Sequence, residues 1–241
     1  MRQPVNRKEE QTIRNIKAPF FVVNPKSFMY GNALQDLALE ADRLAETYDI
    51  DILFTAPIAE LAGIVSTCPN LMVTSQHMDD TNPGDSMGRV FAESLSHIGV
   101  QAVVLNHADH PMSFASLART VRRAYENNLQ TIVCADSVAE AKAAALLDPT
   151  IVLAEPTALI GQEQMSDRKY VTSTIEAIKT VNPNVLVEQG AGIRSAADVE
   201  ELLQLGADGV GVTSGIVKAD NPIQMMENMV KATAAFKHDR R

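Results

Sequence analysis

The stretch NVLVEQGAGIRSAADVEELLQLGADGVGVTSG, residues 184–215, decides the fold class. A short apolar run at 184–189 is followed by a helical pattern at 196–206 and by a second apolar run at 207–213. Runs this short and this continuous are typical of strands that are buried on both faces of a parallel sheet. Because parallel strands need a crossover between them, the stretch predicts a strand-helix-strand unit.

The same alternation extends back along the chain to Pro19. Helical patterns at 32–48 and 114–128 carry apolar residues at i, i+3, i+4 and i+7 with charges on the opposite face. Eight such units of about 28 residues each favour an α/β fold, a single-domain (β/α)8 TIM barrel, over an open doubly wound sheet. The six further strand runs lie at 20–24, 50–55, 71–75, 101–106, 130–135 and 150–155.

Local signals mark the ends of several helices and of the domain. Ser113 and Ser195 are expected as N-caps, and Gly99 and Gly206 fall where C-terminal glycines belong. We expect residues 1–18 to form an N-terminal extension and residues 19–241 to form the barrel domain.

Composition narrows the classes of function. The 241 residues carry a formal net charge of −9, which argues against nucleic acid as a partner. Cys68 and Cys134 cannot build a disulfide framework or a zinc site, so a reducing cytoplasm fits best and no metal is expected. The polar N-terminus and the lack of a long uncharged apolar run predict neither an export signal nor a membrane span.

Chemistry-bearing residues follow several of the predicted strands. In a barrel of this type the active site gathers at the carboxyl ends of the strands. An amide, a cation, an imidazole and a carboxylate are therefore expected to converge there. They are Asn24 and Lys26 after the first strand, Gln76 after the third, His107 after the fourth and Glu155 at the sixth.

Small residues follow the seventh and eighth strands. The loop Gly190, Ala191, Gly192 and the loop that begins at Thr213 and Ser214 allow backbone amides to approach an anion closely. Loops after strands 7 and 8 often bind phosphate in barrel enzymes. A phosphorylated small molecule is the ligand class that this pattern predicts.

Six motifs in order make the chain, over about residues 19–235, similar to triosephosphate isomerases of the compact archaeal type. The resemblance implies interconversion of glycerone phosphate and glyceraldehyde 3-phosphate, no cofactor, and a homo-oligomer, either a dimer or a tetramer. The motifs are NPK at 24–26, SQHMD at 75–79, LNHADHP at 105–111, AEPTALIG at 154–161, GAGI at 190–193 and VTSGIVKA at 212–219.

The resemblance also implies a role for each site residue. Glu155 is expected to be the carbon base, His107 to polarise the carbonyl, Lys26 to offset substrate charge and Asn24 to orient hydrogen bonds. Since the whole chain is acidic, we expect a locally positive mouth around Lys26. The residues expected to bind the phosphate are Gly161, Gly190, Gly192, Thr213 and Ser214.

The chain also departs from the family pattern. The lid continues after Gly161 with Gln162 and Glu163 in place of Thr-Gly, and the His-Ser-Glu segment has Ala108 and Asp109 after its histidine. These changes keep open an isomerase for another phosphorylated ketose, such as a tetrulose phosphate, and a catalytically silent phosphosugar-binding barrel. A long loop from Gln76 to Gly88, with Met87 where the family often has Thr, is expected to dock a second subunit.

Overall fold

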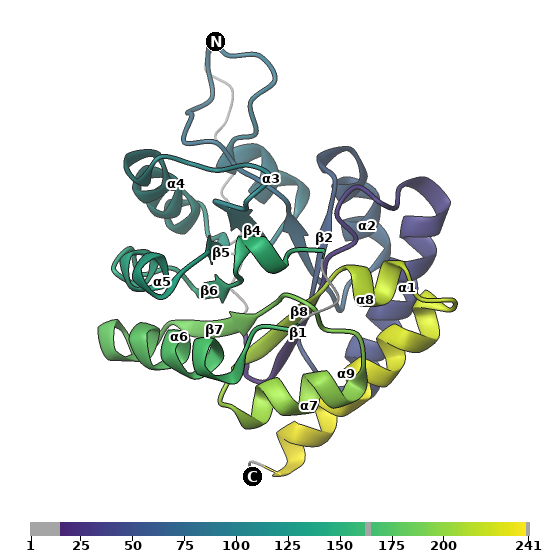
Figure 1. Cartoon of the computed structure of the whole chain (residues 1–241). Coiled ribbons are helices and arrows are strands. Elements are labelled where there is room, and N and C mark those ends of the chain that lie inside the picture. Colours follow the sequence, from purple (N-terminus) through teal and green to yellow (C-terminus); the bar gives the residue numbers. More distant parts are fainter. Residues whose placement is uncertain (1–14, 162–164, 240–241) are drawn as a thin grey trace.

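The eight apolar runs form the strands of a closed barrel in a computed structural model that describes residues 15–161 and 165–239 (Figure 1). Each strand pairs in parallel with the next, and β8 pairs with β1. The barrel fold is confirmed, and the open doubly wound sheet is excluded. The strands are β1 Phe20–Val23, β2 Ile52–Ala56, β3 Met72–Ser75, β4 Ala102–Leu105, β5 Gln130–Ala135, β6 Ile151–Ala154, β7 Leu186–Gln189 and β8 Gly209–Val212.

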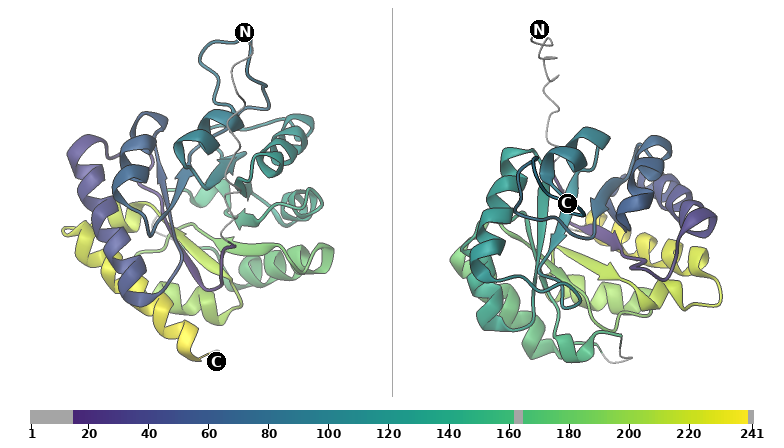
Figure 2. Two further views of the ribbon diagram at one scale, coloured as in Figure 1. Left: turned by 180° about the vertical axis from the view of Figure 1, so that it is seen from behind. Right: turned by 90° about the horizontal axis from the view of Figure 1, so that it is seen from above.

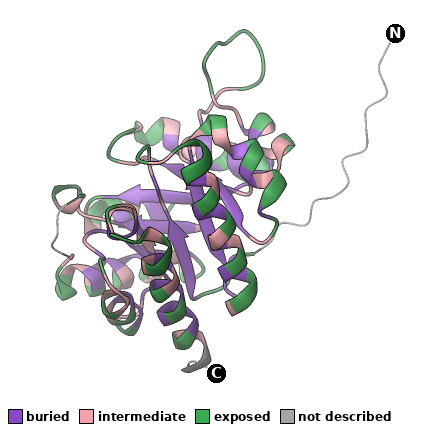
Figure 3. Ribbon diagram, turned by 90° about the vertical axis from the view of Figure 1, so that its right-hand side faces the viewer, coloured by how far each residue is buried: buried purple, intermediate pink, exposed green. Residues whose placement is uncertain are grey.

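Helices surround the barrel and shield the outer faces of its strands (Figure 2). Figure 3 shows that the strands are mostly buried and that the exposed residues lie on the outer sides of the helices. In the described part of the chain the α-helices are α1 Gly31–Tyr48, α2 Leu61–Thr67, α3 Ala92–Ile98, α4 Phe114–Glu126, α5 Val138–Ala145, α6 Arg168–Val181, α7 Ala196–Gln204, α8 Ser214–Val217 and α9 Pro222–Asp239, with 3₁₀ turns η1 Ile58–Glu60 and η2 Thr157–Leu159.

The expected helix ends are confirmed. Ser113 accepts a hydrogen bond from the amide of Ser116, and Ser195 forms a capping box with Asp198. Gly99 ends α3 in the left-handed conformation, and Gly206 follows the end of α7 with φ +105°. These short-range signals mark the start of α4, the end of α3 and both ends of α7.

The apolar core has two layers. The larger layer lies between the strands and the helices, and the smaller fills the inside of the barrel. On β8, Gly209 makes room in the interior, because a Cβ there would lie 2.3 Å from the ring of Phe20. The buried members of the interior layer are Ile16, Phe20, Val22, Leu53, Met72, Ala102, Val104, Ile132, Cys134, Ile151 and Leu153.

The described end of the expected N-terminal extension contacts the barrel. Ile16 joins the interior layer, and the amide of Lys17 donates to Asp51 at 2.7 Å. The other 14 residues of the extension lie outside the described part of the chain. The domain boundary at residue 19 therefore stays a prediction.

Candidate active site

Glu155 follows β6 and points toward the loop after β7. Its Oε1 accepts a hydrogen bond from the amide of Ala191 at 2.8 Å, and its own amide donates to the carbonyl of Ala135 at 3.0 Å. Burial raises the pKa of the Glu155 carboxyl, while the Ala191 hydrogen bond and the charge of Lys26 oppose that rise. The result is a carboxylate more basic than one in water, which suits it to abstract a proton from carbon.

His107, after β4, is held in a defined tautomer. Its Nδ1 accepts a hydrogen bond from the amide of Asp109 at 3.1 Å, so the ring proton of the neutral imidazole is on Nε2. Burial and the positive charge of Lys26 lower the pKa of His107, and the Asp109 carboxylate opposes this. A neutral imidazole that presents Nε2–H can donate a hydrogen bond to a carbonyl oxygen.

Lys26 occupies a strained turn after β1. Its φ is +48°, and its backbone is held by Asn24 Oδ1, which accepts from the Lys26 amide at 3.1 Å, and by Gln76 Nε2, which donates to the Lys26 carbonyl at 2.9 Å. Its Nζ lies 3.5 Å from Asp109 Oδ2. The hydroxyl of Thr55 also donates to Asn24 Oδ1, at 2.6 Å. These contacts fix a cation at the mouth of the barrel.

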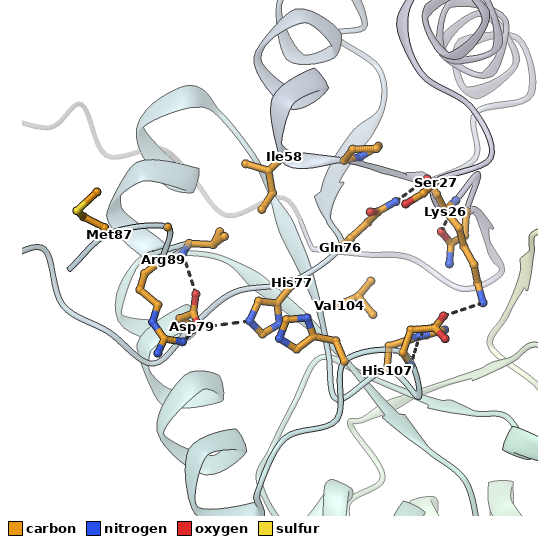
Figure 4. A pocket seen from close by; sticks show the side chains of 16 residues that line it. Lys26, Ser27, Ile58, Gln76, His77, Asp79, Met87, Arg89, Val104 and His107 are labelled. Atoms are coloured by element: carbon orange, nitrogen blue, oxygen red, sulfur yellow. Dashed lines mark hydrogen bonds and ion pairs between the residues drawn. The ribbon is translucent and has the colours of Figure 1, made fainter.

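Two cavities meet at Lys26 and Asp109, which line both. The first, of about 720 Å³, contains Asn24, Gln76 and His107. Figure 4 shows Lys26 and His107 at one end of it and Met87 and Arg89 at the other. The second, of about 540 Å³, holds most of the predicted phosphate-binding residues. The residues that line it and were predicted to bind phosphate are Gly161, Gly192, Thr213 and Ser214, and Lys26 and Glu155 line it as well.

The loops after β7 and β8 pack directly against each other. A Cβ on Gly215 would lie 2.2 Å from the carbonyl oxygen of Ile193. Ala191 and Gly192 both have positive φ, +36° and +75°. Gly190 was predicted to bind the phosphate, but it does not line this cavity. It lies instead against the carboxyl group of Glu155, because a Cβ built on Gly190 would lie 3.0 Å from Glu155 Oε1.

Sequence reasoning missed some residues of the site. Lys218 lines the second cavity, and its Nζ lies 5.8 Å from the ring centre of Phe28. His77 and His110, to which the sequence assigns no role, line the first cavity, and their rings stack with centres 3.6 Å apart. The SQHMD and LNHADHP motifs contain both histidines, but only the fold brings their rings together.

The described ranges contain no group of three metal-ligating side chains. They also contain no helix that is both long enough and apolar enough to cross a membrane. Lid residues 162–164, which include the departures at Gln162 and Glu163, lie outside these ranges.

The site combines a buried carboxylate, a neutral imidazole and a lysine beside glycine-rich loops. This combination at the mouth of a barrel is typical of sugar-phosphate isomerases. The family model for triosephosphate isomerase matches residues 19–231. The chain belongs to the triosephosphate isomerase family, as the motif resemblance predicted.

Its archaeal relatives align over nearly their whole length. The triosephosphate isomerase of Methanothermus fervidus is 34% identical over 88% of this chain and 97% of its own. That of Methanocaldococcus jannaschii is 33% identical over 87% of this chain and 98% of its own. That of Caldivirga maquilingensis is 34% identical over 85% of this chain and 92% of its own.

Proposed function

We propose that this protein interconverts glycerone phosphate and glyceraldehyde 3-phosphate by proton transfer through an enediolate. The observation that carries this proposal is the convergence of Glu155, His107 and Lys26 on two adjoining cavities in a chain of this family. Neither the tetrulose phosphate isomerase nor the silent binding barrel is favoured by family membership.

At the reacting carbons, Glu155 removes a proton from the carbon next to the carbonyl and returns it to the neighbouring carbon. His107 donates from Nε2 to the oxygen that becomes negative, and it carries protons between the two oxygens. Lys26 offsets the charge of the enediolate and the phosphate. Its ion pair with Asp109 lies beside His107, whose unprotonated Nδ1 is 3.3 Å from Asp109 Oδ2.

At the other end of the substrate, backbone amides and cations hold the phosphate. Gly161, Gly192, Thr213 and Ser214 line the second cavity, and their backbone N–H groups supply hydrogen bonds for a dianion. Lys218 adds positive charge at the same wall, in keeping with the predicted positive mouth. Gly190 instead makes room for the carboxylate of Glu155. Binding energy at the phosphate thereby holds the carbon frame against the base.

The test is a coupled assay of the purified protein with glyceraldehyde 3-phosphate. Glu155→Gln keeps the shape of the base and removes its charge, so we expect turnover to fall about a thousandfold. Both proteins are purified in the same way, so any activity from contaminating host isomerase will be equal in the two preparations. Full activity in Glu155→Gln, or turnover on tetrose phosphates alone, would refute the proposal.

A homo-oligomer, dimer or tetramer, is also proposed. The loop between β3 and α3 projects from the barrel (Figure 1), and Met87 in this loop is 97% exposed. Asp79 closes the base of this loop, because its amide donates to the Val90 carbonyl and its carboxylate accepts from the Val90 amide. An exposed apolar side chain on a braced loop supports docking onto a second copy. Sedimentation at micromolar concentration of wild type and Met87→Glu tests this; a wild-type monomer would refute it.

A further inference from the structure

A carboxyl group that takes no part in the proposed reaction lies inside the barrel. Glu188 is on β7, where it pairs in register with Leu153 of β6 and Gly209 of β8. Its side chain is 2% exposed. It shares the inward side of β7 with Leu186, which packs against the interior apolar layer.

The Glu188 carboxyl lies directly behind a wall of the second cavity. A Cβ built on Gly211 would lie 2.1 Å from Glu188 Oε1, so the carboxyl fills the space that this glycine leaves open. Gly211 itself lines the cavity, together with Thr213 and Ser214. Glu188 therefore packs against a residue that lines the cavity of the proposed phosphate site.

The surroundings of Glu188 disfavour a negative charge. Its Oε2 is buried and has no hydrogen-bond partner among the residues that the structure describes. Glu155 approaches from the end of β6 and Cys134 from β5, while β8 contributes glycines and β1 contributes Val22. The positive charge of Lys26 acts on Glu155 and Cys134. Burial, and to a lesser extent the Glu155 carboxylate, raise the pKa of Glu188 to about 8.

We propose that Glu188 is a proton-carrying group behind the phosphate cavity, which admits a phosphate dianion while it is neutral and repels one when it is ionised. The role is electrostatic, since Glu188 is buried and does not line the cavity. The inference rests on the proposed function only for the position of the phosphate. It adds an alkaline limit to ligand binding that the reacting groups do not by themselves explain.

Coupling between ligand binding and the protonation of Glu188 has two measurable consequences. If only the neutral form binds, affinity falls roughly tenfold between pH 7 and pH 9, because the neutral fraction falls from about nine-tenths to about one-tenth for a pKa of about 8. Near pH 8, binding also takes up about half a proton per site, because about half of the free protein must be reprotonated.

Isothermal titration with glycerol 3-phosphate tests both consequences. This probe has the phosphate and three carbons but no carbonyl, so it cannot react. Its phosphate, with a second pKa of about 6, stays a dianion over the range used. Titrations at pH 8 in two buffers of different ionisation heat report proton uptake, and titrations at pH 7 and pH 9 report affinity.

Four proteins separate the role of Glu188 from other effects. Glu188→Gln keeps the shape without the acid, and Glu188→Leu suits the apolar interior if glutamine folds poorly. Glu200→Gln, at an exposed position of α7, is the matched charge control. Any effect of Lys26 or Lys218 on the pH dependence is common to all four and cancels.

We expect wild type and Glu200→Gln to take up protons and to lose affinity tenfold, and both Glu188 variants to do neither. Equal proton uptake and equal affinity loss in wild type and the Glu188 variants would overturn the inference. So would failure of wild type to bind at pH 7. Binding with the expected pH dependence but no turnover of glyceraldehyde 3-phosphate would uphold the inference and refute the isomerase proposal.

Discussion

Replacing Glu188 with Gln changes how the free energy of unfolding depends on pH. In the unfolded chain the carboxyl has an ordinary pKa of 4.5, whereas burial in the barrel raises it to about 8. Between these values the folded state holds a proton that the unfolded state has released. The stabilisation from this proton is fully present below pH 4.5 and is lost as pH rises through about 8.

The magnitude follows from the two pKa values. At 1.36 kcal/mol per pKa unit, linkage gives a loss of about 3 kcal/mol in the free energy of unfolding of wild type between pH 5.0 and pH 7.5 from this group alone. Glu188→Gln lacks the titration. The change in free energy of unfolding over this interval should therefore differ between the two proteins by about 3 kcal/mol, with the variant favoured at pH 7.5.

Urea unfolding curves at pH 5.0 and pH 7.5 measure this difference. All other titrating groups are common to both proteins, so the comparison isolates residue 188. Parallel pH dependence in wild type and Glu188→Gln would refute the reasoning, because it would mean that the folded barrel does not hold the proton.

Three other outcomes are expected. Gly209→Ala should lower the free energy of unfolding by about 2–3 kcal/mol in urea titrations, since its Cβ would lie 2.3 Å from the buried Phe20 ring; an unchanged midpoint would contradict this. Ser195→Ala removes the capping box of α7 and should cost about 1 kcal/mol in the same assay. The acid limb of kcat/KM should have its midpoint above 4.5, because Glu155 must be ionised and burial raises its pKa; a midpoint at or below 4.5 would count against Glu155 as the base.

The strand order and the main site residues could be predicted because both depend on short-range patterns. Each strand is a nearly uninterrupted apolar run, and every β/α unit places the end of its strand at the same face of the barrel. Asn24, Lys26, His107 and Glu155 could therefore be assigned to one candidate site from their positions after three different runs.

Other features depend on contacts between distant segments, which periodicity does not reveal. Gly190 has the sequence context of a phosphate-loop glycine, yet its backbone lies against Glu155, 35 positions away. In sequence, Glu188 is a polar residue within an apolar run. The burial of Glu188 depends on Gly211 of the neighbouring strand, which leaves space for the Glu188 carboxyl.

The departures at Ala108 and Asp109 have different structural consequences. The shorter Asp109 still pairs with Lys26, at 3.5 Å, and its backbone amide rather than its side chain fixes the tautomer of His107. A main-chain donor is insensitive to the length of the side chain, so this function survives the substitution. The ion pair itself is weak, because the Asp109 side chain is 75% exposed.

Ala108 has no hydroxyl to offer Glu155, and in this chain a hydrogen bond to this proposed base comes from the Ala191 amide. Ala191 has φ +36°, a conformation that is strained for a residue with a Cβ, and the next residue, Gly192, lines the proposed phosphate cavity. The proposed base and the proposed phosphate loop are therefore joined through two consecutive residues. We expect a phosphate that draws the Gly192 amide toward itself also to move the donor that holds Glu155, which would couple ligand binding to the position of the base.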